Sequence, residues 1–116
     1  MSKYGNKRTN GFQSKREAKR AAALELLQKA GMISGLRTQV PFELAPSVVI
    51  QGRKRPPLRY FADFVYEELE RVADDLGLAN YKRHLIVEDA KGHVTDSYRI
   101  KRHLMKSVHG IDIREV

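Results

Sequence analysis

Two carboxylates and one amine in the second half of the chain have the types and spacing for metal-assisted chemistry on a phosphodiester. Asp63 interrupts an apolar run, RYFADFVYEE, while Asp89 and Lys91 close another, RHLIVEDAKG. Successive side chains of a strand point to opposite faces, so Asp89 and Lys91 project from the same face. If the two runs pair, Asp63 and Asp89 converge on one hard cation, Mg²⁺ or Mn²⁺, with the ammonium group of Lys91 beside it.

A simpler interpretation treats these residues as the surface ends of strands, with Lys91 and Gly92 starting a turn. D-x-K triplets are frequent in a chain with 31% charged residues, so spacing alone leaves both interpretations open. Position favours the site, because an unpaired carboxylate on a core face costs roughly several kcal/mol. Glu88 competes with Asp89 for this role, and the parity of Lys91 favours Asp89 unless a bulge reverses it.

Length and charge limit the classes of function. A chain of 116 residues has room for one modest core and is expected to form a single domain. Its formal net charge of +8 favours a polyanionic partner, and nucleic acid is the commonest one. An anionic membrane is the competing partner, but no segment approaches the ~20 apolar residues of a membrane span.

Cysteine and histidine usage narrows the chemistry further. The chain has no cysteine, which excludes a disulfide framework and a thiolate zinc site and suits a reducing cytosol. The basic first residues precede no apolar stretch, so no secretory signal is expected. The four histidines have no recurrent ligand spacing, and we interpret them as ordinary surface or interface residues.

The N-terminal third predicts a basic arm followed by a helix. Residues 1–11 are polar and basic and are expected to form a flexible arm. Ser14 and Glu17 then form an S-K-R-E capping box, and good helix formers continue to Gly31. Ala21, Leu24 and Leu27 give this helix its core stripe. Glu17 lies close to the stripe and could reach a metal site, although the local sequence favours a capping role alone.

The middle of the chain predicts three strands and a basic loop. The strands are expected at about residues 36–44, 59–66 and 81–90, and an acidic segment, 67–78, is either a short helix or an extended hairpin. Residues 46–57 are interpreted as a loop that carries Arg53, Lys54 and Arg55, the densest positive cluster of the chain. The loop is suited to straddling a phosphate backbone, and the alternative is a solvated hairpin tip.

The C-terminal segment predicts a second helix and a closing strand. Thr95 or Asp96 caps the helix, which runs through Val108 with a stripe of Ile100, Leu104 and Val108. Its other side, which also carries His103, is basic and is predicted to contact a nucleic-acid backbone through Arg99, Lys101, Arg102 and Lys106. Residues 111–116, IDIREV, alternate as a final strand.

Taken together, the element order and three motifs resemble the PD-(D/E)XK nuclease superfamily. The motifs are F-x-S-K-x-E-A-K, Y-x-A-D-F and V-E-D-A-K-G. More closely, nearly the whole chain resembles a family of small phage-encoded proteins of unassigned function in the resolvase and TnsA-like branch. The resemblance implies an α/β, restriction-endonuclease-like core, in which helices flank a central mixed four-stranded sheet in the order α-β-β-β-α-β.

The resemblance also assigns roles to matching residues. Asp63 matches the aspartate of the first motif, with Ala62 where the family has proline, and Asp89 and Lys91 match the acid and lysine of the second. Glu17 matches the glutamate of the first helix, which makes it an expected third ligand of Mg²⁺ or Mn²⁺. The chain departs from the family in the segment between Asp63 and Asp89, which is about twice the usual hairpin.

The expected function is that of a magnesium-dependent endodeoxyribonuclease. A small domain has little surface for reading bases, so we expect selectivity for DNA structure, such as junctions. The resemblance places it in phage recombination or processing, in the host cytoplasm. A homodimer would allow paired cuts, although no stretch demonstrates one. The alternatives are a binding protein that keeps the fold without cutting, and an RNA-binding or ribosome-associated protein.

Overall fold

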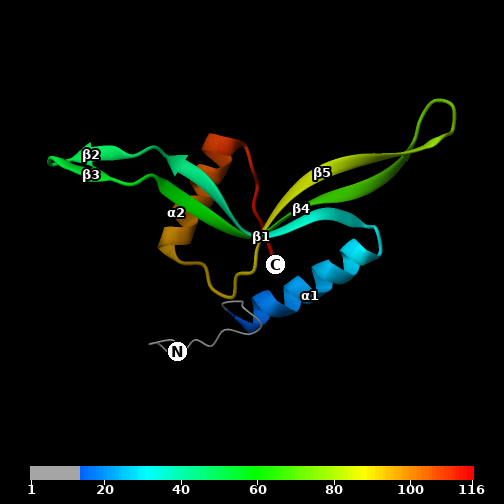
Figure 1. Ribbon diagram of the computed structural model, residues 1–116, viewed down its shortest axis with the longest axis horizontal. Helices are drawn as coiled ribbons and strands as arrows, with labels where there is room; N and C mark the ends of the chain where they lie inside the picture. Colours follow the sequence, from blue (N-terminus) through cyan, green and yellow to red (C-terminus); the bar gives the residue numbers. More distant parts are fainter. Residues whose placement is uncertain (1–13) are drawn as a thin grey trace.

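The fold is a four-stranded sheet with two helices and one small separate hairpin (Figure 1). The computed structural model describes residues 14–116, so the predicted arm at residues 1–11 lies outside the described residues. The elements in chain order are α1 (Lys15–Lys29), β1 (Ile33–Ala45), β2 (Val48–Ile50), β3 (Arg53–Arg55), β4 (Leu58–Ala73), β5 (Ala79–Asp89), α2 (Asp96–His109) and β6 (Arg114–Glu115).

The main sheet has the strand order β1-β4-β5-β6. β1, β4 and β5 pair antiparallel and β6 joins β5 in parallel, which confirms the predicted mixed four-stranded sheet in a two-helix α/β arrangement. The β2–β3 hairpin is an addition that the predicted element order lacks. No helix within residues 14–116 is long and apolar enough to cross a membrane.

Helix α1 begins and packs as the sequence predicts. The Ser14 side chain accepts a hydrogen bond from the Glu17 backbone N–H at 3.1 Å, which caps the first turn. Ala21 and Leu24 are buried and Leu27 is partly buried. This stripe packs against one hydrophobic cluster of the sheet, formed with Ile33, Phe64 and Tyr66.

The extent of helix α2 is predicted correctly, but the prediction of which helix face is buried is wrong. Tyr98 and Met105 are its buried residues, whereas Ile100 is 62% exposed and Val108 52% exposed. Tyr98 and Met105 are seven residues apart and share one face, which packs against a second cluster that includes Tyr60 and Val87. At about 100° per residue, Ile100 lies about 160° around the helix from Tyr98 and therefore faces away from the cluster.

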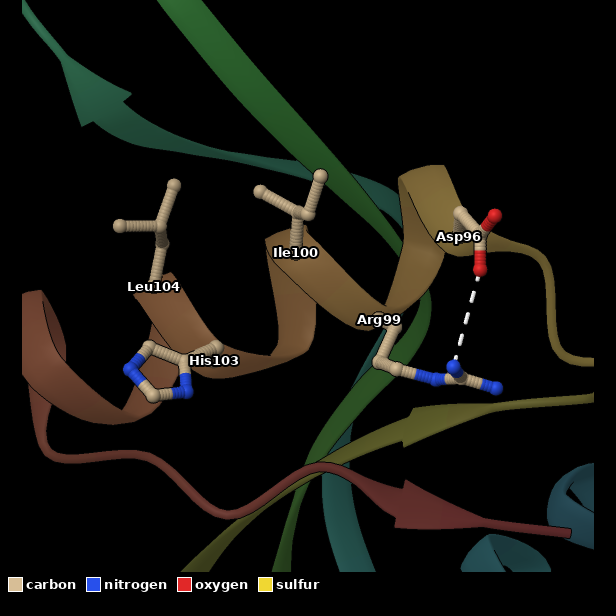
Figure 2. A pocket seen from close by; sticks show the side chains of 5 residues that line it. All are labelled: Asp96, Arg99, Ile100, His103 and Leu104. Atoms are coloured by element: carbon tan, nitrogen blue, oxygen red, sulfur yellow. Dashed lines mark ion pairs between the residues drawn. The ribbon is translucent and has the colours of Figure 1, made fainter.

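The outer face of α2 forms a shallow apolar hollow. Ile100 and Leu104 project from the helix there, next to Arg99 and His103, and Arg99 forms an ion pair with Asp96 at 3.6 Å (Figure 2). Of the stripe predicted as core, Ile100 and Val108 are therefore surface residues, whereas Leu104 is partly buried and packs against the second cluster.

The predicted basic loop contains a second, two-stranded sheet. β2 and β3 pair antiparallel through Val48↔Arg55, Val49↔Lys54 and Ile50↔Arg53. Gln51 and Gly52 form the turn with φ values of 51° and 77°, and positive φ at both central residues matches the twist of a tight hairpin. The hairpin projects from one end of the molecule (Figure 1), and all six strand residues are exposed.

The acidic segment forms the extended hairpin and not the short helix. The β4–β5 register runs without a break from Phe64↔Glu88 to Ala73↔Ala79. Its turn is closed by the Asp74 side chain, which accepts hydrogen bonds from the backbone N–H groups of Leu76 and Leu78. The long insertion between the two motifs therefore continues the strands that carry them.

The corrected face of α2 can be tested by unfolding. Met105 is fully buried, so we expect Met105→Ala to lower the free energy of unfolding by about 2–5 kcal/mol. Ile100→Ala removes an exposed side chain and should change it by about 0.5 kcal/mol or less. Urea unfolding at neutral pH measures both, and an Ile100→Ala cost equal to that of Met105→Ala would contradict the packing.

Candidate active site

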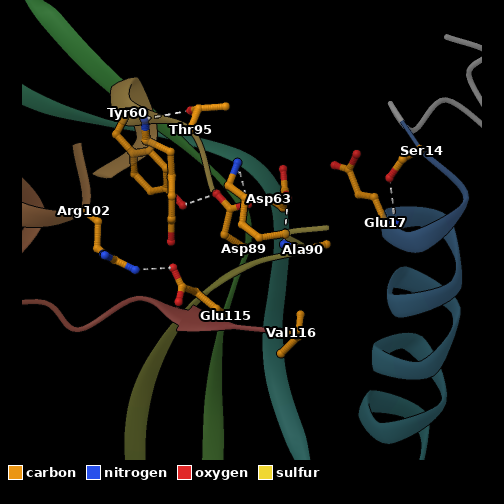
Figure 3. A network of polar contacts seen from close by, with 12 residues as sticks. Ser14, Glu17, Tyr60, Asp63, Asp89, Ala90, Thr95, Arg102, Glu115 and Val116 are labelled. Atoms are coloured by element: carbon orange, nitrogen blue, oxygen red, sulfur yellow. Dashed lines mark hydrogen bonds and ion pairs between the residues drawn. The ribbon is translucent and has the colours of Figure 1, made fainter. Parts of the chain in front are cut away.

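Strand register places Asp63 across from Asp89. The last register pair of the β4–β5 ladder is Phe64↔Glu88, and the next positions outward are Asp63 and Asp89. In an antiparallel pair, opposite residues lie on the same face. The Asp63 Oδ2 atom also accepts a hydrogen bond from the Ala90 N–H at 2.9 Å, which ties the two strand ends together (Figure 3).

Asp89 is buried with incomplete compensation for its charge. It is 2% exposed, and its Oδ2 atom accepts a hydrogen bond from the Tyr60 hydroxyl. The Lys91 Nζ atom lies 3.2 Å from Oδ1, yet this oxygen has no hydrogen bond with suitable geometry to any residue within 14–116. Buried carboxylate oxygens are normally hydrogen-bonded, so Oδ1 has capacity for another positive partner.

Glu88 lies on the opposite face and is fully neutralised there. Its carboxylate accepts two hydrogen bonds from the Arg20 guanidinium, at 2.8 and 2.7 Å, and one from the Tyr66 hydroxyl. This paired arrangement is typical of a structural ion pair. Of the two neighbouring acids, Asp89 therefore faces the Lys91 side, as parity predicts.

The pKa values of the facing aspartates are raised. Burial raises the pKa of Asp89 to about 6, and the nearby Asp63 charge adds to the effect, while Tyr60 and Lys91 oppose it. Burial also raises the pKa of Asp63, and the charge of Glu17 acts in the same direction against the Ala90 N–H and the Gln39 amide. Two like charges held close out of water disfavour joint ionisation, and a cation would relieve that cost.

Glu17 reaches the site through Gln39. Glu17 is 3% exposed, and its Oε1 atom accepts a hydrogen bond from the Gln39 Nε2 atom at 2.7 Å. The same Nε2 atom donates to Asp63 Oδ1 at 3.1 Å. The Gln39 contact gives the Glu17 side chain a role besides capping.

Sequence reasoning missed Gln39. The residue lies between Thr38 and Val40, which pair with Phe64 and Ala62, so it stands opposite Asp63. A single polar residue within a strand carries no signal of this kind, and only the β1–β4 register identifies it.

A cavity of about 230 Å³ brings three predicted residues together. Its lining consists of Asp63, Asp89 and Lys91 with Tyr60, Phe61, Thr95, Ser97, Tyr98 and Lys101. Lys91 lies over the Tyr98 ring, with its Nζ atom 4.4 Å from the ring centroid, a cation–π contact that positions the ammonium group. The Val116 backbone N–H donates a hydrogen bond to the Asp89 carbonyl, and the Val116 carbonyl accepts one from the Lys91 N–H. These two hydrogen bonds fix the segment that carries both side chains.

The predicted convergence of three acids is met only in part. Within residues 14–116, no group of three or more Asp, Glu, His or Cys side chains is placed to hold one metal ion. Asp63 and Asp89 face each other, while Glu17 is joined to Asp63 by the Gln39 amide. The donors are all oxygens, and Asp89 Oδ1 lacks a hydrogen bond, so the pair fits a hard cation such as Mg²⁺ or Mn²⁺.

The predicted nucleic-acid-binding residues fall into two groups. Arg53, Lys54 and Arg55 on β3 are exposed, and no carboxylate of the described residues forms an ion pair with them. On α2, ion pairs join Arg99 to Asp96, Arg102 to Glu115 at 2.9 Å, and Lys106 to Asp112 at 2.8 Å. Lys101 instead lines the cavity. The hairpin and Lys101 therefore carry the less compensated charge.

Comparison with known proteins yields one family. A family described as "Protein of unknown function (DUF1064)" matches residues 1–114. No curated protein and no solved structure matches the chain at a significant level.

The raised pKa of Asp89 predicts a pH dependence of stability. The carboxyl titrates at about 6 in the folded protein and at about 3.9 when unfolded. Between those values the folded protein holds a proton that the unfolded chain has released, so raising the pH through this window destabilises the fold. Asp89→Asn has no carboxyl group to titrate at this position. Its free energy of unfolding, compared with that of wild type, should therefore rise by on the order of 2 kcal/mol when the pH is raised from 4.5 to 7.5.

Urea unfolding at the two pH values, in EDTA, measures this difference. Asp75→Asn, which changes an exposed acid at the far hairpin turn, is the control and should follow wild type. Parallel pH profiles for Asp89→Asn and wild type would show that the Asp89 carboxyl is not held protonated by burial.

Proposed function

The chain belongs to the DUF1064 family of proteins of unknown function, and we propose that it is a metal-dependent endonuclease that hydrolyses DNA phosphodiester bonds. The observation that carries the proposal is that Asp63, Asp89 and Lys91 line one cavity at the neighbouring ends of β4 and β5. The order of helices and main-sheet strands also supports a restriction-endonuclease-like core of the PD-(D/E)XK type.

Four residues of the cavity have a task in this proposal. Asp63 and Asp89 would hold Mg²⁺ or Mn²⁺, which when bound supplies charge neutralisation and activation of water. The Tyr60 hydroxyl orients the Asp89 carboxylate. Lys91 is 28% exposed in its side chain and stacked on Tyr98, so its ammonium group can donate to the charge that develops on a phosphoryl oxygen.

Charge and shape favour nucleic acid as the substrate. The chain carries a formal net charge of +8, and the exposed β2–β3 hairpin extends the basic surface away from the sheet (Figure 1). Such a hairpin can follow a phosphate backbone without reading bases. We therefore propose selectivity for DNA structure, with branched or junction DNA as the preferred form and a homodimer as the arrangement for paired cuts.

The catalytic assignment is tested by two substitutions. Lys91→Ala and Asp89→Asn should each lower Mg²⁺-dependent cleavage of labelled junction, flap or linear DNA by about 10²-fold or more. Lys91→Ala removes a positive charge beside the phosphoryl group, and Asp89→Asn weakens the binding of the metal ion. DNA binding, measured by mobility shift, should stay within a few-fold of wild type.

Matched controls separate catalysis from folding. Lys82→Ala and Asp75→Asn change exposed residues of the far β4–β5 hairpin and should keep full cleavage. Wild-type binding without cleavage on every DNA form, in Mg²⁺ and in Mn²⁺, would favour the non-catalytic binding protein. A preference for RNA over all DNA forms would favour the RNA-binding alternative.

The role of the hairpin is tested by salt dependence. Replacing Arg53, Lys54 and Arg55 together with glutamine should weaken DNA binding and reduce the slope of log affinity against log salt by about 2–3, since each lost phosphate contact removes about 0.9. Fluorescence anisotropy with a labelled duplex between low and moderate salt measures the slope.

A charge-matched control lies at the other end of the molecule. Arg71, Lys82 and Arg83 are exposed on the far β4–β5 hairpin, and replacing all three with glutamine gives the same net charge. An equal change of slope in both triple variants would mean that overall charge, and not the β2–β3 hairpin, determines affinity.

A further inference from the structure

Gln39 adopts an unusual backbone conformation for a strand residue. Its φ is 50°, and Gln39 and Gln51 are the residues other than glycine with positive φ in the described part of the chain. Gln51 lies in the tight β2–β3 turn, where that conformation is normal. Gln39 lies within β1, opposite Asp63, where the left-handed region is uncommon.

The Gln39 amide bridges two acids that come from different elements. Its Nε2 atom is 2.7 Å from Glu17 Oε1 on α1 and 3.1 Å from Asp63 Oδ1 on β4. These two hydrogen bonds hold the Glu17 and Asp63 carboxylates to the same nitrogen atom, between the helix and the sheet. A neutral amide supplies only a dipole there, so it does not balance two negative charges.

The position of Nε2 is also a suitable position for an oxygen ligand. The terminal torsion of glutamine is broad and roughly two-fold, so the amide can exchange Nε2 for Oε1 at small cost. Amide carbonyl oxygens bind hard cations alongside carboxylates. Gln39 is exposed, so solvent and ions can reach the amide.

We propose that Gln39 is a ligand of the cation site, with its amide turning so that Oε1 joins Glu17 and Asp63 around the ion. This inference rests on the proposed function, because it names a further residue of the same metal site. It also explains how Glu17 could join the predicted metal ligands. The Gln39 amide lies between Glu17 and Asp63, and a cation bound by Gln39 would draw the Glu17 carboxylate towards Asp63.

Calorimetric titration with Mn²⁺, without DNA, tests the proposal. Gln39→Met keeps the length of the side chain and removes the oxygen donor, and we expect its Mn²⁺ affinity to fall by about 10-fold or more. Gln39→Glu keeps an oxygen at the same reach and adds charge, so its affinity should equal or exceed that of wild type.

Gln51→Met is a closely matched control. It makes the same change at the other glutamine with positive φ, 51° against 50°, remote from the acids, and it should bind Mn²⁺ like wild type. Thermal unfolding in EDTA identifies any variant that fails to fold. If Gln39→Met does not fold, the Mn²⁺ titration of Gln39→Glu alone tests the proposal.

The outcomes separate this inference from the proposed function. Unchanged or tighter Mn²⁺ binding by Gln39→Met, or weaker binding by Gln39→Glu, would overturn the role of Gln39 and leave the Asp63–Asp89 site intact. Absence of Mn²⁺ binding by the wild-type protein would overturn both the metal site and this inference.

Discussion

The antiparallel register between β4 and β5 is the constraint on which the rest of the site depends. The two aspartates are far apart in sequence, and an unbroken ladder from Ala73↔Ala79 to Phe64↔Glu88 brings their strand ends together. A slip by one residue would turn every side chain of one strand to the other face. It would put Glu88 in place of Asp89 across from Asp63, so register decides which acid faces Asp63.

Neighbouring acids at the end of β5 show two ways of burying charge. Glu88 receives a bidentate guanidinium from Arg20, a complete pairing that helps join α1 to the sheet. Asp89 receives one hydroxyl and a nearby ammonium group, and its pKa is raised to about 6 because burial outweighs these partners. A carboxylate whose charge is fully neutralised is typical of a structural ion pair. A buried carboxylate in a cavity whose negative charge is only partly balanced is typical of a binding site.

The sequence predicts the elements better than their faces. Helix α1, its Ser14 cap and the mixed sheet follow from local patterns. Asp89 and Lys91 lie together in one cavity, as their parity predicts. The face of α2 was not predictable, because two apolar stripes compete and the large Tyr98 ring fits the cluster near Tyr60. The position of Gln39 opposite Asp63 follows from the β1–β4 pairing, which no local sequence pattern specifies.

The central claim is that Asp63 and Asp89 bind one hard cation together. Crystals of the protein with Mn²⁺, examined by anomalous scattering, test it most directly. The account predicts a single strong peak within about 2.6 Å of a carboxylate oxygen from each residue. A peak elsewhere, or ordered aspartates with no peak at saturating Mn²⁺, would contradict it.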